Sequence, residues 1–207
     1  MPGSLIRLKR LYEEVSKNSA VLETSMDFEK IFTFLLKNFK KYNIQYALMG
    51  GFALHAAGYT RATQDIDILI RKEDMPKVKK LLLSLGYEVL HESEDVVNLR
   101  GMIKELGQID FVLAHRQYAQ NMLKRAQEYG ILNNKFKLKV LVPEDIIGLK
   151  VQAMANDPGR QSRDWADIEK LAALHKDKLD QKLLREYFSL FGREKEWDKL
   201  LEKHKNA

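Results

Sequence analysis

The sequence predicts an α/β (α+β) fold, in which a mixed sheet with its covering helices is followed by a bundle of helices. One observation is that short apolar or alternating runs, typical of strands, are interspersed with longer amphipathic segments up to residue 140. The other is that strand patterns stop after Pro143 and only helical patterns follow. We therefore expect an α/β core with N-terminal helices over residues 1–142 and a C-terminal helical bundle over residues 143–207.

The composition narrows the class of protein. With 45% hydrophobic and 31% charged residues, the 207-residue chain has the balance of a globular protein. No apolar run approaches the roughly 18 residues that would indicate a membrane span. The chain has no cysteine, so we expect neither disulfides nor thiolate metal ligands, and we expect a cytoplasmic protein. The net charge of +6 is compatible with a nucleic-acid or polyphosphate partner, and equally with simple solubility.

Two helices are expected before the first strand. Residues 4–17 place apolar side chains on one stripe. The second helix begins after Thr24 or Ser25, either of which can act as its N-cap, with Asp27 in the capping-box position after Thr24. This helix runs to about Tyr42, and its aromatic stripe predicts a side that packs in the core.

The middle of the chain alternates strands with helices. The strand at 64–70 is expected to be central, because it is apolar on one face and at its end. Val142-Pro143 then starts the first bundle helix, since proline is tolerated in a first turn. The expected elements are a strand at 46–49, a helix from Gly50 to Ala57 closed by Gly58, a strand at 64–70, a helix from Asp74 as cap to Leu85, strands at 87–91, 96–103 and 108–113 with a hairpin turn at Leu106-Gly107, a helix at 116–129, a strand at 136–140, and helices at about 143–156, 160–175, 180–190 and 193–204.

Three aspartates stand inside apolar strands. Asp65 and Asp67 lie on one face of their strand, because side chains repeat every second residue. Charge in such a context is costly unless it is paired, and paired carboxylates suit Mg²⁺, which takes oxygen ligands. Asp110 has the same context in the strand at 108–113. If these strands are neighbours, two metal ions could bind there and support an in-line displacement at phosphorus.

A glycine pair precedes these carboxylates. Gly50-Gly51 stands at a strand-to-helix turn, where a ligand can approach the backbone closely because no Cβ intervenes. Free backbone N–H groups at the start of the next helix favour a phosphate. Alone, such a pair also marks an ordinary turn.

Together these residues resemble the nucleotidyltransferase superfamily with the polymerase-β-like fold. Its members have a Gly-Gly or Gly-Ser turn, a pair of aspartates on the next strand and a third aspartate further on. The form found here, followed by a helical half, is most similar to AbiEii-type toxin nucleotidyltransferases, over roughly residues 44–172. The matching motifs are Gly50-Gly51, Arg61-x-Thr63-x-Asp65-Ile66-Asp67-Ile68 and the isolated Asp110.

The resemblance implies roles for these residues. Asp65 and Asp67 would bind two Mg²⁺ ions, and Asp110 would complete one site and help to deprotonate the attacking hydroxyl. A nucleoside triphosphate such as ATP would be held by Gly50, Gly51, Arg61, Thr63 and Lys150. Arg61 could instead pair structurally with a carboxylate, and Thr63 could simply suit a strand.

A second polar cluster lies in the helical half. Lys150 follows apolar residues on its helix and could reach a phosphate or extend to solvent. Asp164 could support Lys150 or Arg163. Arg160 and Arg163 could contact a nucleic acid, or form an ordinary charged helix face.

The implied reaction is magnesium-dependent transfer of a nucleoside monophosphate from an NTP to an acceptor hydroxyl. The resemblance implies the toxin of a toxin–antitoxin system, with a cognate antitoxin as partner. A tRNA 3′ end or a protein hydroxyl would be the acceptor, and no membrane partner is expected. The alternatives are an aminoglycoside-type enzyme that modifies a small molecule, and a non-catalytic member that binds a nucleotide or a protein. The presence of all three aspartates disfavours the last alternative.

Overall fold

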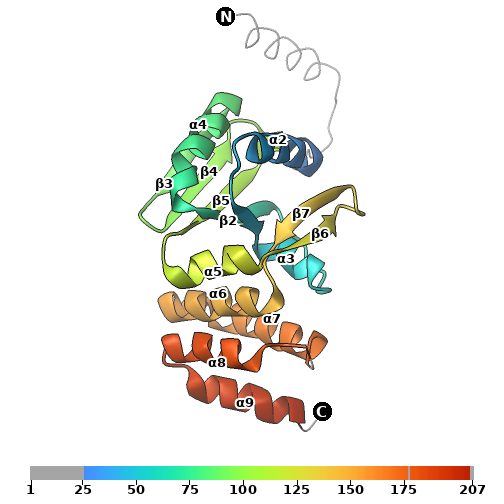
Figure 1. The fold of residues 1–207 in the computed structure, drawn as a ribbon, viewed down its shortest axis with the longest axis vertical. Helices are drawn as coiled ribbons and strands as arrows, with labels where there is room; N and C mark the ends of the chain where they lie inside the picture. The colour runs from blue at the N-terminus through green and yellow to red at the C-terminus, as the bar shows by residue number, and fades with distance from the viewer. Residues whose placement is uncertain (1–25, 177, 206–207) are drawn as a thin grey trace, which may run out of the picture.

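A computed structural model describes residues 26–176 and 178–205 of the chain, and Figure 1 shows the arrangement of its elements. The expected helix at 4–17 and the candidate caps Thr24 and Ser25 lie outside the described residues. The predicted fold class is confirmed: a seven-stranded mixed sheet is combined with helices, and the described residues from Pro143 onward form helices. Whether the parts before and after residue 142 are separate domains stays a prediction.

The seven strands form one sheet in the order β3-β4-β5-β2-β1-β7-β6. The pairs β2–β5 and β1–β7 are parallel, and the other neighbouring pairs are antiparallel. The strand that carries the paired aspartates, β2, is the middle one, as its apolar sequence predicts. The strands are β1 Tyr46–Leu48, β2 Asp65–Arg71, β3 Tyr87–Glu92, β4 Val96–Gly101, β5 Gln108–Ala114, β6 Gln127–Ile131 and β7 Phe136–Val140.

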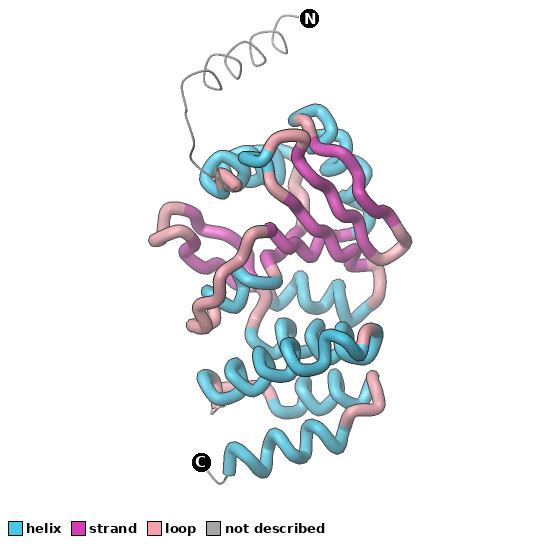
Figure 2. The backbone as a smooth tube through the Cα atoms, turned by 180° about the vertical axis from the view of Figure 1, so that it is seen from behind, coloured by secondary structure: helices cyan, strands magenta, loops and turns pink. Residues whose placement is uncertain are grey.

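The helices lie on both sides of the sheet region. Figures 1 and 2 show α6 to α9 stacked one beyond another, on the side of the molecule away from α2 and α4. No helix among the described residues is long and apolar enough to cross a membrane. The α-helices are α2 Phe28–Lys41, α3 Gly50–Ala56, α4 Met75–Leu85, α5 Gln117–Arg125, α6 Pro143–Asn156, α7 Gln161–Leu174, α8 Gln181–Leu190 and α9 Glu194–Lys205, and the short 3₁₀ helices are η1 Lys72–Asp74, η2 Lys104–Leu106 and η3 Pro158–Arg160.

The aromatic stripe of α2 packs in the core, as predicted. The ring of Phe32 lies 5.1 Å from that of Phe52 on α3 and 5.9 Å from that of Phe136 on β7. The ring of Phe39 lies 4.7 Å from that of Tyr46 on β1. This packing holds α3, which begins with the glycine pair, against the sheet.

The helix predicted at 116–129 is wrong over its last four residues, 126–129. Helix α5 ends at Arg125, Ala126 turns into an extended conformation, and β6 pairs antiparallel with β7. The alternation of Gln127, Tyr129 and Ile131 suits a strand, and pairing with β7 satisfies backbone groups that a longer helix would have bonded locally. The predicted hairpin turn at Leu106-Gly107 is confirmed, because η2 and Gly107, with φ of +60°, join the antiparallel strands β4 and β5.

Two predicted helix caps need correction. The cap of α2 is Asp27, whose side chain accepts a hydrogen bond of 3.1 Å from the backbone N–H of Lys30. Asp74 precedes α4, but its side chain does not cap that helix. It is buried and accepts hydrogen bonds from the Arg71 guanidinium, at 3.0 and 3.1 Å, and from the backbone N–H of Gln45 at 3.2 Å. A cation three residues away therefore competes successfully for this carboxylate.

A buried polar cluster fastens the C-terminal helices to the core. Asp145 on α6 is fully buried and accepts two hydrogen bonds from Arg125 on α5, at 2.7 and 3.2 Å. The hydroxyl of Tyr187 on α8 donates to the same carboxylate at 2.6 Å, and burial raises its pKa. A buried carboxylate is stable only with such partners, so this cluster fixes α6 and α8 relative to α5.

Candidate active site

Polar side chains form two adjacent rows across strands β4, β5 and β2. Backbone register places residues directly opposite each other in each row. Because alternate residues of a strand point to the same face, all six side chains belong to one face of the sheet. The first row is Asn98, Asp110 and Asp67, and the second row is Arg100, Gln108 and Asp65.

The carboxylate of Asp110 is held by neutral amides of both rows. The Nδ2 of Asn98 donates to Oδ1 at 2.6 Å, and the Nε2 of Gln108 lies 3.0 Å from Oδ1 and 3.1 Å from Oδ2. The sequence analysis missed these two residues. Gln108 could have been found, since it stands two positions before Asp110 on the same strand. Asn98 could not, because its position depends on the register of β4 against β5.

The charge of Asp67 is held in an unfavourable environment. Burial, followed by the charges of Asp110 and Asp65, raises the pKa of Asp67 to about 6, while Arg160 and Lys150 act in the opposite direction. Burial and the charge of Asp110 also raise the pKa of Asp65. No described residue donates a hydrogen bond to the Asp67 carboxylate. Such a group is stabilised by a cation.

Gly50 lies so close to the Asp67 carboxylate that a residue with a Cβ does not fit at position 50. Its φ is +59°, and a Cβ at this position would lie 1.9 Å from Oδ2 of Asp67. Gly51 makes a similar approach to Thr63, where a Cβ would lie 2.5 Å from the Thr63 Cβ and 2.7 Å from its Oγ1. The Thr63 hydroxyl donates to the backbone carbonyl of Asp65 at 3.0 Å. The glycine pair, Thr63 and the paired aspartates therefore form one contiguous surface.

Lys150 and Arg61 are both bound to buried carboxylates of α7. The Nζ of Lys150 lies 3.0 Å from Oδ1 of Asp164 and 2.5 Å from Oδ2 of Asp167. Arg61 donates to the same Asp167 oxygen at 2.7 Å, and Arg160 donates to Asp164 at 2.8 Å. This network ties the segment before β2 to the helical half. The structural pairing of Arg61 and the support of Lys150 by Asp164, both foreseen as options from the sequence, are present.

The network also fixes the charge state of Asp164. Burial would raise its pKa, but hydrogen bonds from Arg160 and Lys150 outweigh burial and lower the pKa. The buried carboxylate therefore stays ionised, which holds both cations in place. Because the charges of Lys150 and Arg160 act on Asp67, the network places positive charge beside the carboxylate rows.

The donor set fits Mg²⁺ in part. Asp65 and Asp67 supply hard oxygen ligands, and Mg²⁺ is usually bound by one or two carboxylates together with substrate phosphates and water. Across residues 26–176 and 178–205, no group of three or more His, Cys, Asp or Glu is arranged to hold a metal ion. Asp110 is engaged by Asn98 and Gln108. The pair alone therefore fits the ion, and the third carboxylate would have to shift to become a ligand.

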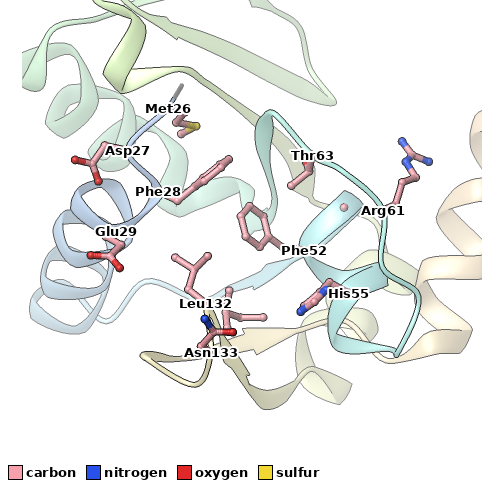
Figure 3. Close-up of a pocket in the computed structure, with 12 residues that line it drawn as sticks. Met26, Asp27, Phe28, Glu29, Phe52, His55, Arg61, Thr63, Leu132 and Asn133 are labelled. Atoms are coloured by element: carbon pink, nitrogen blue, oxygen red, sulfur yellow. The ribbon is translucent and has the colours of Figure 1, made fainter. Parts of the chain in front are cut away.

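A cavity of about 580 Å³ lies beside the glycine pair (Figure 3). Phe28 and Phe52 meet within it, with their rings 5.0 Å apart at an angle of 79°. Its two acids are both paired, Asp27 with Lys30 and Glu29 with Lys135. Other residues that line it are Met26, Gly51, His55, Arg61, Thr63, Ile131, Leu132 and Asn133.

Solved structures show the class of protein that this fold defines. An antibiotic-resistance factor, ANT(2'')-Ia, matches with a TM-score of 0.57 and 17% identity over 88% of this chain and 100% of its own. A lincosamide antibiotic adenylyltransferase, LnuA, matches at 0.52 and 18% over 73% and 99%. An antigenic nucleotidyltransferase-like protein from Paracoccidioides brasiliensis matches at 0.51 and 18% over 86% and 95%. The protein thus has a nucleotidyltransferase-like fold.

The sequence itself gives the family. Residues 15–200 match the family described as "Uncharacterised nucleotidyltransferase". The chain therefore belongs to this nucleotidyltransferase family, and it is an enzyme that uses a nucleoside triphosphate. No curated protein matches the sequence.

Proposed function

We propose that the protein transfers a nucleoside monophosphate from an NTP to an acceptor hydroxyl with the help of Mg²⁺. The observation that carries this proposal is the position of Asp67, between the Gly50 turn on one side and Asp110 on the neighbouring strand. The hydroxyl oxygen forms a bond to the α-phosphorus, and the bond from that phosphorus to the bridging oxygen breaks. Pyrophosphate leaves with the electron pair.

The carboxylates divide the work in this proposal. Asp65 and Asp67 hold the magnesium and the phosphates, and magnesium, when bound, neutralises charge on the phosphoryl group. Asp110 accepts the proton of the attacking hydroxyl, and it would complete the metal site once its carboxylate had shifted toward the pair. Its Oδ2 suits this role, because it receives only the Gln108 amide at 3.1 Å, while Oδ1 receives both amides.

The nucleotide-binding residues are proposed on their placement around Asp67. Gly50 and Gly51 let their backbone approach the side chains of Asp67 and Thr63 closely, so that the turn, the carboxylate and the Thr63 hydroxyl can meet one triphosphate together. Lys150 and Arg61 share Asp167, which holds two positive charges at the edge of the site. A triphosphate would draw on this charge without requiring either cation to leave its buried partner.

We further propose that the protein is an AbiEii-type toxin that acts in the cytoplasm, on a tRNA 3′ end or secondarily on a protein hydroxyl, and is countered by an antitoxin. The support is the Arg61 to Ile68 motif together with the basic balance of +6 and the absence of cysteine. A small-molecule acceptor is the alternative. Both acids of the cavity in Figure 3 are paired with lysines, so this cavity offers no unpaired acid to a cationic drug.

Label transfer tests this proposal. The wild-type protein is incubated with each α-³²P-labelled NTP, Mg²⁺ and total tRNA or cell lysate, beside the Asp65→Asn/Asp67→Asn variant. We expect label on one class of acceptor with the wild type and none with the variant. No label on RNA, protein or small molecule, together with no metal-dependent nucleotide binding, would overturn the proposal.

A further inference from the structure

A second cavity, of about 460 Å³, is lined by the three residues of the second row, Asp65, Gln108 and Arg100. Met26, Phe28 and Thr63 line both cavities and lie between them. The first cavity reaches Gly51 and Arg61, whereas the second reaches Asp65 and Gln108 and continues over residues 100–104. Of the two cavities, the second is therefore the one that is lined by one of the three aspartates, Asp65.

The order of the strands indicates from which side the acceptor approaches the α-phosphorus. Gly50 lies two residues after the end of β1. From β1 the sheet continues through β2, which carries Asp67, to β5, which carries Asp110, and then to β4. An in-line displacement places the attacking and leaving oxygens on opposite sides of the phosphorus. With the triphosphate at the glycine turn, pyrophosphate leaves on the β1 side. The acceptor must then approach from the side of β5 and β4, where the second cavity lies.

The charge of this cavity differs from that of the first. Arg100 and Lys104 are exposed, and neither side chain pairs with a carboxylate in the described part of the chain. Arg100 stands in the second row, next to Gln108 and two strands from Asp65. Glu88 stands opposite Arg100 on β3, but no ion pair joins these two described residues, so both cations are available to attract phosphate and to repel a polycationic acceptor.

Apolar side chains accompany these cations. Met102 is 73% exposed and Ile103 is 37% exposed, and both line the cavity with Met26 and Phe28. Single-stranded nucleic acids bind where cations that meet their phosphates lie beside aromatic side chains on which bases stack, and Phe28 is the aromatic residue that lines this cavity. A free sugar or an aminoglycoside would use neither feature.

We propose that the second cavity is the acceptor subsite, and that Arg100 and Lys104 select an acceptor that carries phosphate groups beside its reacting hydroxyl, as the end of a polynucleotide does. This inference rests on the proposed nucleotidyl transfer and adds the place and the charge of the acceptor. Arg100 and Lys104 bind the phosphates that precede the reacting hydroxyl, and the apolar lining with Phe28 contacts a base.

Binding of a short single-stranded RNA, labelled with fluorescein at its 5′ end, tests the proposal directly by anisotropy over a range of salt concentrations. The Arg100→Gln/Lys104→Gln variant should bind this RNA about tenfold more weakly, and its salt dependence should fall by about 1–2 in the slope of log K against log salt. The matched control is Lys80→Gln/Arg185→Gln, which removes two exposed cations on α4 and α8. It should bind like the wild type. Tobramycin, titrated alone in a calorimeter, should not bind.

Three results would overturn the inference: no RNA binding by the wild type, equal binding by the cavity variant, or tobramycin binding that the cavity variant alters.

The label-transfer assay distinguishes failure of this inference from failure of the proposed function. If the wild type transfers label and the cavity variant does so with unchanged acceptor KM, only the acceptor subsite is wrong. If the wild type transfers no label to any acceptor, the nucleotidyl transfer itself is wrong. The expected result is a raised acceptor KM with an unchanged KM for the NTP.

Discussion

The Cα of Gly51 lies against the side chain of Thr63, so that a Cβ at position 51 would stand 2.7 Å from the Thr63 hydroxyl oxygen. The threonine hydroxyl thus occupies the space that a serine at position 51 would need. In this chain, a hydroxyl near the glycine turn comes from the segment before β2 and not from the turn itself.

This relationship predicts the outcome of an exchange. Gly51→Ser should lower activity because its side chain collides with Thr63, and Thr63→Ala should lower activity because it removes the hydroxyl. The double variant Gly51→Ser/Thr63→Ala should recover most of the lost kcat/KM, since it removes the collision and restores a hydroxyl. Steady-state kinetics with the NTP varied measure this. A double variant that is no better than the worse single variant would show that the two positions do not share this role.

The raised pKa of Asp67 predicts how stability depends on pH. A carboxyl with a pKa near 3.9 in the unfolded chain and about 6 in the folded protein binds its proton more tightly when folded. The free energy of unfolding therefore falls as pH rises from about 4 to about 6, and stays lower above that window. Asp67→Asn should be more stable than the wild type at pH 8, by on the order of 1–3 kcal/mol, and the difference should narrow near pH 5.

Urea denaturation with EDTA present measures this difference at both pH values. Mg²⁺ should reduce it at pH 8, because the ion stabilises only the wild-type carboxylate. A variant less stable than the wild type at both pH values would contradict the electrostatic reading of this site.

The buried carboxylate of Asp164 predicts a structural cost. Asp164→Asn leaves Lys150 and Arg160 without the charge that holds them, and breaking a buried ion pair costs about 3–5 kcal/mol. The free energy of unfolding should fall by about this amount in denaturant titrations. Asp198→Asn on the exposed face of α9 is the control and should change it little. Equal effects of the two substitutions would rule out a stabilising role for the network.

The Asn98 amide predicts an effect on the chemical step. Asn98→Ala removes the 2.6 Å hydrogen bond that orients Asp110, and a hydrogen bond to a charged group contributes about 1.5–3 kcal/mol. The value of kcat should fall about tenfold or more, while KM for the NTP stays constant, because β5 and β2 separate Asn98 on β4 from β1, which leads into the glycine turn. Asn98→Asp should be worse, since Asp110 would then stand between two carboxylates of its row, at positions 98 and 67. A change confined to KM would contradict this role.

Local patterns predicted much of the fold, and they failed where tertiary pairing decides. The alternation around Asp65 and Asp67 predicted a strand. Its central position was predicted because the sequence of β2 is apolar on one face and at its end. Residues 127–129 were predicted as helix because the strand to which they belong becomes evident only through its pairing with β7.

The candidate site divides in the same way. The glycine pair and the three aspartates could be predicted because their residue types alone indicate close backbone approach and metal binding. The structure brings them together. The partners of these residues depend on contacts far apart in the chain. Arg61 meets Asp167, and Asn98 meets Asp110, only after the helical half and β4 have packed.

The most direct test of nucleotidyl transfer compares one NTP labelled at two positions. With ³²P at the α-phosphate, the wild-type protein should place label on the acceptor in the presence of Mg²⁺, and Asp67→Asn should not. With ³²P at the γ-phosphate, the acceptor should stay unlabelled and the label should appear in pyrophosphate. Label on the acceptor from the γ-position, or from neither position, would contradict the account.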